Sequence, residues 1–202
     1  MKKQDLLAAL VVVVLGGPLA FMLTSAFADG EVRRHEMPLR AMLGDQAYEA
    51  LARGENGEVH YMGNERLVPD FELRDEAGNT FNMRAMRGRV VVLNFWTTTC
   101  GPCIEEMPNL VQLSRILGER DDIELVTIST DRTWDEIHTV LPPNTEMRVL
   151  LDADRSVVRG RFGTRMYPET WIIDPNGAVR LRVDGARDWS SAVALDLFES
   201  YL

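Results

Sequence analysis

The sequence has very few cysteines and histidines. Cys100 and Cys103 are the only cysteines among 202 residues, so the chain carries no framework of structural disulfides. A structural zinc site takes about four nitrogen, sulfur or oxygen ligands, whereas His35, His60 and His138 are scattered and form no second pair at ligand spacing. We therefore expect no zinc site and no other resident metal.

Lysine is nearly absent, and the charge balance is acidic. Lys2 and Lys3 are the only lysines, and the formal net charge is −9. Because no basic stripe interrupts the acidic background, the sequence argues against nucleic-acid binding. Internal repeats and low-complexity segments are missing as well. A chain of this length is typical of one domain of roughly 100–200 residues with an additional segment.

An uncharged apolar stretch follows the two lysines and runs from Leu6 to Ala28. It is long enough to cross a bilayer, for which about 20 residues suffice. Ala26-Phe27-Ala28 also fits the cleavage site of a signal peptide, but a secretory apolar region normally has only about 7–15 residues. We therefore interpret residues 1–28 as a signal-anchor in preference to a cleaved signal peptide, with the rest of the chain in an oxidising compartment.

The remaining sequence divides into a spacer over residues 29–68, with a short helix, and one α/β domain over residues 69–202. Alternating strand and helix patterns predict a central mixed β-sheet with helices on both faces. The expected elements are a hairpin around Asp75–Asn79, buried strands over 89–96 and 122–130, a helix over 102–120, short helices over 133–141 and 155–162, a brief strand over 147–152, a hairpin over 169–185 and a terminal helix capped by Asp188.

Cys100 and Cys103 lie in the stretch WTTTCGPC, where the buried strand gives way to the long helix. The dipole at a helix start favours a thiolate, and the pKa of a cysteine there is lowered from about 8.5 into the range of about 3.5–7.5. Cys103 is placed to attack a mixed disulfide formed on Cys100. A static disulfide across so short a loop would add little stability. We interpret the pair as an exchanging dithiol that needs no cofactor.

Two stretches carry a family resemblance. FWTTTCGPCIEEMP resembles the active site of the thioredoxin superfamily, and YPETWIIDPNG resembles its second signature. With the apolar N-terminal segment and the lead-in FELRDEAGNTFNMRAMRGRVVVLNFW, they resemble the TlpA/ResA branch of exported, membrane-tethered thioredoxin-like proteins. The resemblance runs from about Pro69 to the C-terminus. It implies an α/β thioredoxin-like fold with an N-terminal hairpin.

The resemblance also implies roles for single residues. Cys100 would exchange disulfides with the substrate, and Cys103 would resolve the mixed disulfide. Glu106 would tune the dithiol and shuttle protons, whereas the alternative is an ordinary exposed helix glutamate. Pro168 would be a cis-proline that leaves the backbone of Tyr167 free to pair with an extended substrate strand. The residues expected to bind substrate are Trp96, Gly101, Pro102, Tyr167 and Pro168.

The implied function is reduction of disulfides in cysteine-containing exported proteins, because the CGPC tetrapeptide is that of thioredoxin, whose potential is about −270 mV. Apocytochrome c is the substrate that the resemblance favours, and an oxidant or isomerase is the other direction. A reductant there needs a membrane electron donor of the DsbD/CcdA kind. We expect a monomer on the periplasmic side of the bacterial inner membrane, held through residues 6–28, or a soluble periplasmic protein if the signal is cleaved.

Two other functions are compatible with parts of the pattern. Thr97-x-x-Cys100 matches the T-x-x-C of peroxiredoxins, but Leu93 stands where their proline is expected. A Sco-like copper-delivery or respiratory-complex assembly factor is the second alternative, because thiolates select Cu(I). No histidine follows His138, so the two cysteines would act alone or with Met166. The chain also has Thr99 before the first cysteine, where many relatives have an aromatic residue.

Overall fold

The computed structural model describes residues 36–46, 48, 67–118 and 120–202. The predicted signal-anchor over residues 1–28 and most of the predicted spacer lie outside the described residues. Within the described ranges, no helix has the length and apolar character needed to cross a membrane.

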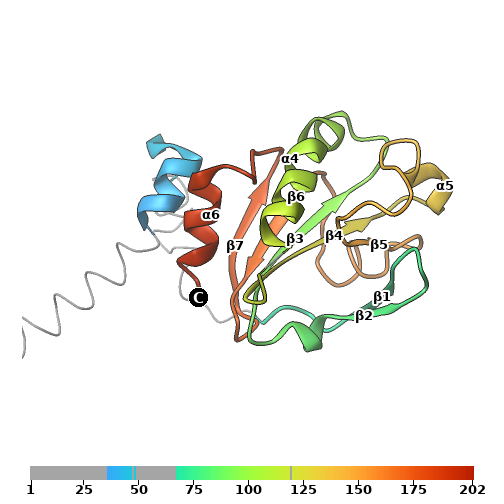
Figure 1. The fold of residues 1–202 in the computed structure, drawn as a ribbon, viewed down its shortest axis with the longest axis horizontal. Helices are drawn as coiled ribbons and strands as arrows, with labels where there is room; N and C mark the ends of the chain where they lie inside the picture. Colours follow the sequence, from blue (N-terminus) through green and yellow to red (C-terminus); the bar gives the residue numbers. More distant parts are fainter. Residues whose placement is uncertain (1–35, 47, 49–66, 119) are drawn as a thin grey trace, which may run out of the picture.

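A seven-stranded mixed sheet forms the centre of the structure (Figure 1), in the order β2-β1-β5-β4-β3-β6-β7. β3, β4 and β5 are parallel, whereas β6 is antiparallel to β3 and β7 is antiparallel to β6. This confirms the mixed sheet and the N-terminal hairpin. The strands are β1 (Glu72–Arg74), β2 (Thr80–Asn82), β3 (Val90–Trp96), β4 (Ile123–Ser129), β5 (Val149–Leu151), β6 (Glu169–Ile173) and β7 (Val179–Asp184).

β3 is the central strand, and all seven of its residues are buried. Its run of valine, leucine and aromatic residues suits a strand that is covered on both faces. Val90 and Val92 face one hydrophobic cluster with α4 (Gly101–Leu117) and α6 (Ala192–Glu199). Val91 and Leu93 face a second cluster on the opposite side. The strand therefore ends between two packed layers, which fixes the position of the loop that follows it.

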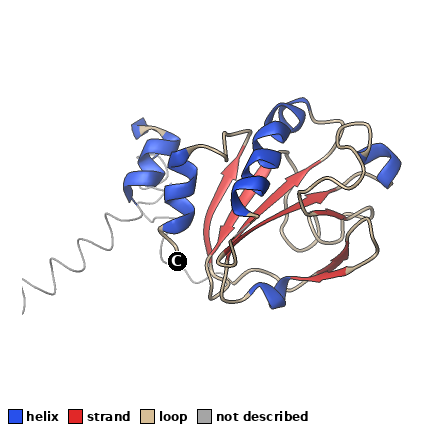
Figure 2. Cartoon of the chain, viewed as in Figure 1, coloured by secondary structure: helices blue, strands red, loops and turns tan. Residues whose placement is uncertain are grey.

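The helices of the described chain lie around this sheet (Figures 1 and 2). α4 packs across β3 through a buried stripe that includes Cys103, Met107 and Leu110. α5 (Trp134–Ile137) is shorter than the helix predicted over 133–141. A 3-10 helix, η2 (Met83–Met86), follows the first hairpin. With its central mixed sheet and flanking helices, the chain has the thioredoxin-like fold that its sequence predicts.

One predicted helix is wrong. Residues 155–162 form turns, because Arg155 adopts the left-handed conformation (φ 59°) and the N–H groups of Val157 and Val158 bind the carboxylate of Asp152. Those N–H groups are thereby taken by a side chain instead of a helical carbonyl. The segment still packs on the second cluster through Val157 and Phe162.

The cap of the terminal helix also differs from the prediction. α6 begins after Ser191, whose Oγ accepts a 3.3 Å hydrogen bond from the N–H of Ala194. Asp188 instead accepts hydrogen bonds from the N–H and Oγ of Ser190, one turn earlier. A serine in the extended conformation is as good a cap as an aspartate, so the helix starts later than expected.

Part of the segment predicted as a spacer packs on the domain. Residues 36–43 are helical, and Leu39 is fully buried in the same cluster as Leu197 and Phe198 of α6. Figure 1 shows this helix beside α6, and residues of the two helices line a common depression of about 480 Å³. Tyr48 is buried in the same cluster. The domain boundary at residue 69 stays a prediction.

Candidate active site

The two cysteines form a disulfide at the start of α4. Cys100 is the N-cap residue, and its Sγ accepts a 3.2 Å hydrogen bond from the N–H of Cys103. Cys100 is half-buried, whereas Cys103 is 1% exposed. The sulfur of Cys100 therefore lies at the positive end of the helix dipole, where a thiolate is stabilised. One sulfur is accessible and the other is protected behind it.

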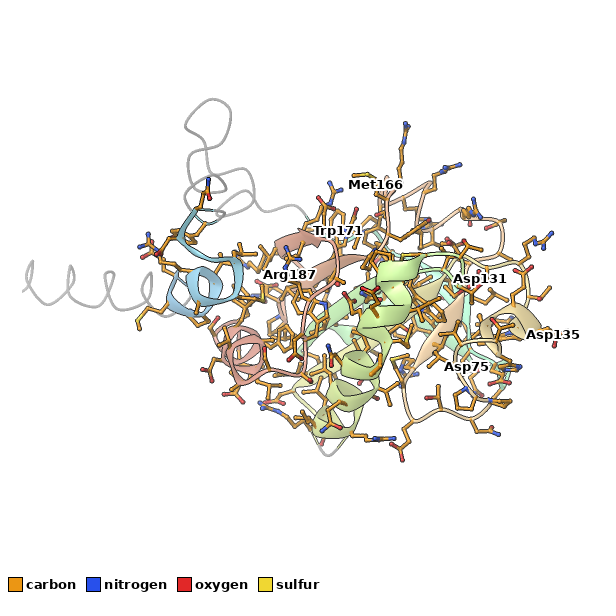
Figure 3. All side chains as sticks on the ribbon, turned by 90° about the horizontal axis from the view of Figure 1, so that it is seen from above. Asp75, Asp131, Asp135, Met166, Trp171 and Arg187 are labelled. Carbon is orange, nitrogen blue, oxygen red and sulfur yellow. A yellow bond between two sulfur atoms is a disulfide. The ribbon has the colours of Figure 1, made fainter. Side chains whose placement is uncertain are left out.

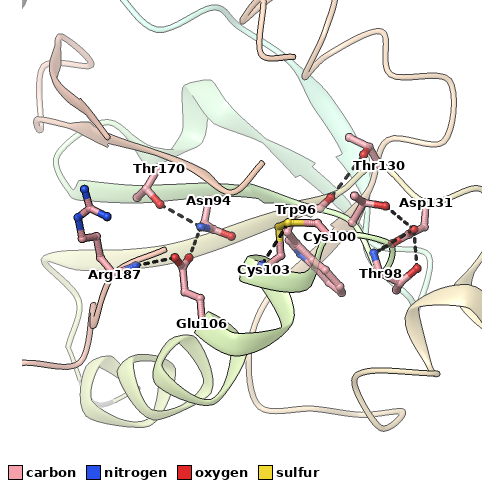
Figure 4. The surroundings of a disulfide bond; sticks show 11 residues. Asn94, Trp96, Thr98, Cys100, Cys103, Glu106, Thr130, Asp131, Thr170 and Arg187 are labelled. Carbon is pink, nitrogen blue, oxygen red and sulfur yellow. Dashed lines mark hydrogen bonds between the residues drawn. A yellow bond between two sulfur atoms is a disulfide. The ribbon is translucent and has the colours of Figure 1, made fainter. Parts of the chain in front are cut away.

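Glu106 is buried, in contrast to the exposed helix glutamate that was the alternative. Its side chain is 2% exposed. The carboxylate accepts hydrogen bonds from Nδ2 of Asn94 at 2.8 Å and from the backbone N–H of Arg187 at 2.9 Å (Figure 4). Desolvation raises the pKa of Glu106 from 4.5 to about 7, although these two donors lower it in part. The group therefore changes charge near neutral pH.

Asn94 links Glu106 of α4 to Thr170 of β6. This fully buried residue of β3 also donates from Nδ2 to Oγ1 of Thr170, at 2.9 Å. Its Oδ1 is buried and has no hydrogen-bond partner among the described residues. A polar side chain with an unsatisfied oxygen costs stability in a central strand, which argues that Asn94 has a role other than packing.

A second buried carboxylate lies on the other side of the disulfide (Figure 4). Asp131, just after β4, is 4% exposed. It accepts hydrogen bonds from the hydroxyls of Thr97, Thr98 and Ser129 at 2.7–2.8 Å and from the N–H of Thr98. These contacts join the end of β4 to the loop between β3 and Cys100.

The loop before β6 carries the second signature. The Tyr167–Pro168 peptide bond is cis, as the resemblance implies. Pro168 is buried and Tyr167 is half-buried. Directly after them, Glu169 is 1% exposed and accepts hydrogen bonds from Thr164 at 2.6 Å and Arg182 at 2.7 Å, and another from the indole N–H of Trp171. Glu169 therefore ties the loop to the hairpin β6–β7.

The other predicted site residues differ in exposure. Gly101 and Pro102 are exposed beside Cys100, where a substrate can reach them. Trp96 is fully buried, so its part in this structure is packing behind the dithiol. The substrate contacts of these residues stay a prediction. No group of three or more His, Cys, Asp or Glu side chains suited to a metal is present in the described ranges.

Sequence reasoning missed Asn94 and Asp131, and it left the burial of Glu106 open. For Glu106 a signal was available, because it lies three residues after Cys103 and four before Leu110, on the buried stripe of α4. For Asp131 the signal was weaker. It follows the strand that pairs with β3 in parallel, and the carboxyl ends of parallel strands lie at one edge of the sheet.

Taken together, the arrangement can carry out dithiol chemistry. Cys100 is accessible and lies at a helix N-terminus, and Cys103 is within disulfide distance of it. Glu106 lies one helical turn from Cys103 and its pKa of about 7 suits proton transfer at neutral pH. The exposed residues Arg165 and Met166 and the half-buried Tyr167 lie in the loop of the cis-proline.

The sequence is similar to proteins of known name. The thioredoxin-like protein YneN of Bacillus subtilis is 24% identical over 113 residues, which cover 56% of this chain and 66% of that protein. The thiol-disulfide oxidoreductase ResA of the same organism is 29% identical over 119 residues, 58% of this chain and 65% of that protein. The chain thus spans slightly less than two thirds of the length of these two relatives.

A solved structure shares the fold. A proposed thiol:disulfide interchange protein DsbE from Chlorobium tepidum superposes with a TM-score of 0.60 at 24% identity, covering 70% of this chain and 99% of that one. The ResA relatives agree with the resemblance seen in the sequence. The profile of the AhpC/TSA family matches residues 65–182, more than half of the sequence, and the chain therefore belongs to the AhpC/TSA family.

Proposed function

We propose that this protein is a thiol–disulfide oxidoreductase that reduces disulfides in exported proteins. The observation that carries the proposal is the pairing of a half-exposed Cys100, at the N-cap of α4, with a buried Cys103. The first sulfur can meet a macromolecular substrate, and the second can meet only the first. The similarity to ResA, named a thiol-disulfide oxidoreductase, supports the same activity.

The reaction starts from the reduced dithiol. The Cys100 thiolate attacks one sulfur of the substrate disulfide, so that a mixed disulfide forms and the other substrate sulfur leaves as a thiolate, which takes up a proton. Cys103 then loses its proton and attacks the Cys100 sulfur. This step closes the Cys100–Cys103 disulfide and releases the second substrate thiol. Two electrons and two protons pass to the substrate in total.

Glu106 supports the second step as proton acceptor for Cys103. The two residues lie three positions apart in α4 and both are buried on the same face. A carboxyl group with a pKa of about 7 is partly ionised at neutral pH and can accept a proton there. Attack by Cys103 needs the thiolate, so removal of the proton makes resolution faster.

Continued reduction in an oxidising compartment requires a source of electrons. We propose a membrane electron donor of the DsbD/CcdA type, whose dithiol reduces the Cys100–Cys103 disulfide by the same exchange in reverse order. Apocytochrome c is the proposed substrate within the class of exported cysteine-containing proteins. This assignment places the domain on the periplasmic side of the inner membrane, with residues 6–28 as the proposed anchor.

A trapping experiment tests the proposal. The full-length Cys103→Ala variant is expressed in cells, thiols are quenched with acid, and proteins linked to Cys100 are identified by mass spectrometry. Exported cysteine proteins should accumulate as mixed disulfides, because the resolving thiol is gone. The matched Cys100→Ala variant should trap none of them. Equal adducts on both variants, or a wild-type protein that reduces no protein disulfide, would refute the function.

A hydrogen bond of Thr97 argues against the peroxidase alternative. The hydroxyl of Thr97 donates a 2.7 Å hydrogen bond to Asp131. In a peroxidase of the T-x-x-C type this hydroxyl would instead point to the reacting sulfur of Cys100. Consumption of hydrogen peroxide by the reduced protein distinguishes the two. We expect it to be no faster than that of the Cys100→Ser variant, which lacks the sulfur that would react with peroxide.

A further inference from the structure

Asp131 is the acceptor of a hydrogen-bond network that surrounds the loop before Cys100. Oδ1 accepts from the hydroxyls of Thr97 and Thr98, at 2.7 and 2.8 Å. Oδ2 accepts from the N–H of Thr98 at 3.0 Å and from the hydroxyl of Ser129 at 2.7 Å. The backbone N–H of Asp131 donates in turn to Oγ of Ser129, at 3.0 Å. Both carboxylate oxygens are thus fully used.

These contacts hold the turn from which α4 starts. The N–H of Cys100 donates a 3.1 Å hydrogen bond to the carbonyl of Thr97, which closes the turn over residues 97–100. The same Thr97 and its neighbour Thr98 are bound to Asp131 through their side chains. The turn is therefore fixed at its first two residues by Asp131, just after β4, and at its last residue by α4. Thr99 between them is exposed.

The groups that donate hydrogen bonds to Asp131 are all uncharged, which is unusual for a buried carboxylate and suggests a role beyond stability. Among the described residues, no Lys, Arg or His forms an ion pair with Asp131, although its carboxylate is 4% exposed. All the donors are neutral hydroxyls and one amide. Burying a carboxylate without a cation is costly. The hydrogen bonds from Thr97, Thr98 and Ser129 compensate for this cost, and they hold the loop in one geometry next to the reactive sulfur.

We propose that Asp131 is a positioning residue for Cys100, which holds the Thr97–Cys100 turn so that the sulfur stays at the N-cap of α4. The inference rests on the proposed exchange function. In this position Sγ accepts a hydrogen bond from the N–H of Cys103. The thiolate formed on reduction is stabilised by the same N–H and by the helix dipole. When the turn is released, Cys100 leaves the N-cap for part of the time and its thiolate is stabilised less.

The test measures the pKa of the Cys100 thiol in the full-length chain. In a Cys103→Ala background Cys100 is the only thiol, and its ultraviolet thiolate absorbance is followed against pH together with the rate of alkylation by iodoacetamide. Asp131→Ala should raise the pKa of Cys100 by about one unit, which lowers the thiolate fraction and the alkylation rate about tenfold below that pKa. Glu106, the other buried carboxyl group near the dithiol, is unchanged in all variants.

Asp131→Asn separates position from charge. Asparagine keeps an oxygen that accepts from Thr98, whereas it removes a buried negative charge that disfavours a nearby thiolate. The pKa of Cys100 should therefore stay the same or fall, whereas in the alanine variant, which loses the same charge and also every hydrogen bond to the turn, it should rise. Asp135→Ala, an exposed acid in the first turn of α5 (Figure 3), should leave the pKa of Cys100 unchanged.

If Asp131→Ala does not fold, substitutions of the threonines that donate hydrogen bonds to Asp131 test the same inference. Thr97→Val and Thr98→Val each remove one hydroxyl and leave Asp131 in place, and each should raise the pKa of Cys100 by a smaller amount. A lower melting temperature with an unchanged pKa in Asp131→Ala, or in both threonine variants, would overturn the inference. Absence of protein-disulfide reduction by the wild type refutes the proposed function, and the alkylation result is independent of it.

Discussion

Asn94 in β3 donates a 2.8 Å hydrogen bond from Nδ2 to Oε1 of Glu106 in α4. The strand that leads to the dithiol thus binds the buried carboxylate of the helix that follows it. The same Nδ2 reaches Thr170 in β6, so one side-chain amide joins three elements around the site. An amide donor favours the ionised form of a carboxyl group.

Asn94→Ala should therefore raise the pKa of Glu106 further above its value of about 7. The variant removes a donor to the charged carboxylate and leaves its burial in place. Titration of the Glu106 carboxyl carbon by NMR measures the shift. Asn109→Ala, on the same helix and without a hydrogen bond to the Glu106 carboxylate, is the control. A pKa of Glu106 that stays constant or falls in Asn94→Ala would contradict the assigned contact.

Glu106 should make the stability of the fold depend on pH. Its pKa is raised from 4.5 to about 7 in the folded state, so between these values the native state holds a proton that the unfolded state has released. This stabilisation is complete below pH 4.5 and is lost as pH rises to about 7, by about 3 kcal/mol in total. Urea unfolding of the wild type at several pH values measures the loss.

Glu106→Gln should remove this part of the pH dependence, because glutamine does not titrate. Glu105→Gln is the matched control, since Glu105 is the exposed neighbour on the same helix. Its stability curve should follow that of the wild type. Parallel curves for the wild type and Glu106→Gln over the same pH range would show that Glu106 is not protonated near neutral pH.

Leu39→Ala should destabilise the thioredoxin-like domain by roughly 2–5 kcal/mol, the usual cost of removing a fully buried leucine side chain. Leu39 is 0% exposed, whereas Met37 in the same helix is 71% exposed. Met37→Ala should change the free energy of unfolding by no more than about 0.5 kcal/mol. Denaturant unfolding measures both. Equally small effects would restore the interpretation of this segment as a spacer.

Arg182→Met should cost more stability than Glu169→Gln. Removing the arginine leaves the 1% exposed carboxylate of Glu169 without its cation, which costs about 3 kcal/mol. Removing the charge of Glu169 leaves an arginine that is 31% exposed and still paired with Asp184. Urea unfolding of both variants gives the order, with the exposed Arg159→Met as control. The reverse order would mean that the pair does not hold the loop.

The sequence predicted the elements that depend on local patterns. β3 is a continuous apolar run, α4 has helical spacing after a strand end, and both hairpins have turn residues. The dithiol and the cis bond before Pro168 followed from motifs. These features need only neighbours in the chain, which a single sequence displays.

What the sequence did not predict depends on contacts between distant positions. Asp131 binds Thr97, 34 residues earlier, and Asn94 binds Thr170, 76 residues later. The turns over 155–162 form because the carboxylate of Asp152 takes the N–H groups of Val157 and Val158. Such partners are chosen by the packing of the sheet, and residue type alone does not identify them.

The loop before β6 is fastened on both sides of two exposed residues. Thr164 binds Glu169 at 2.6 Å, and Pro168 is buried, whereas Arg165 and Met166 between them face solvent, Met166 with 71% exposure (Figure 3). Substitutions at these two positions should leave the framework intact, because neither side chain supports it. These two positions can therefore change in sequence while the cis-proline loop and the dithiol beside it keep their framework.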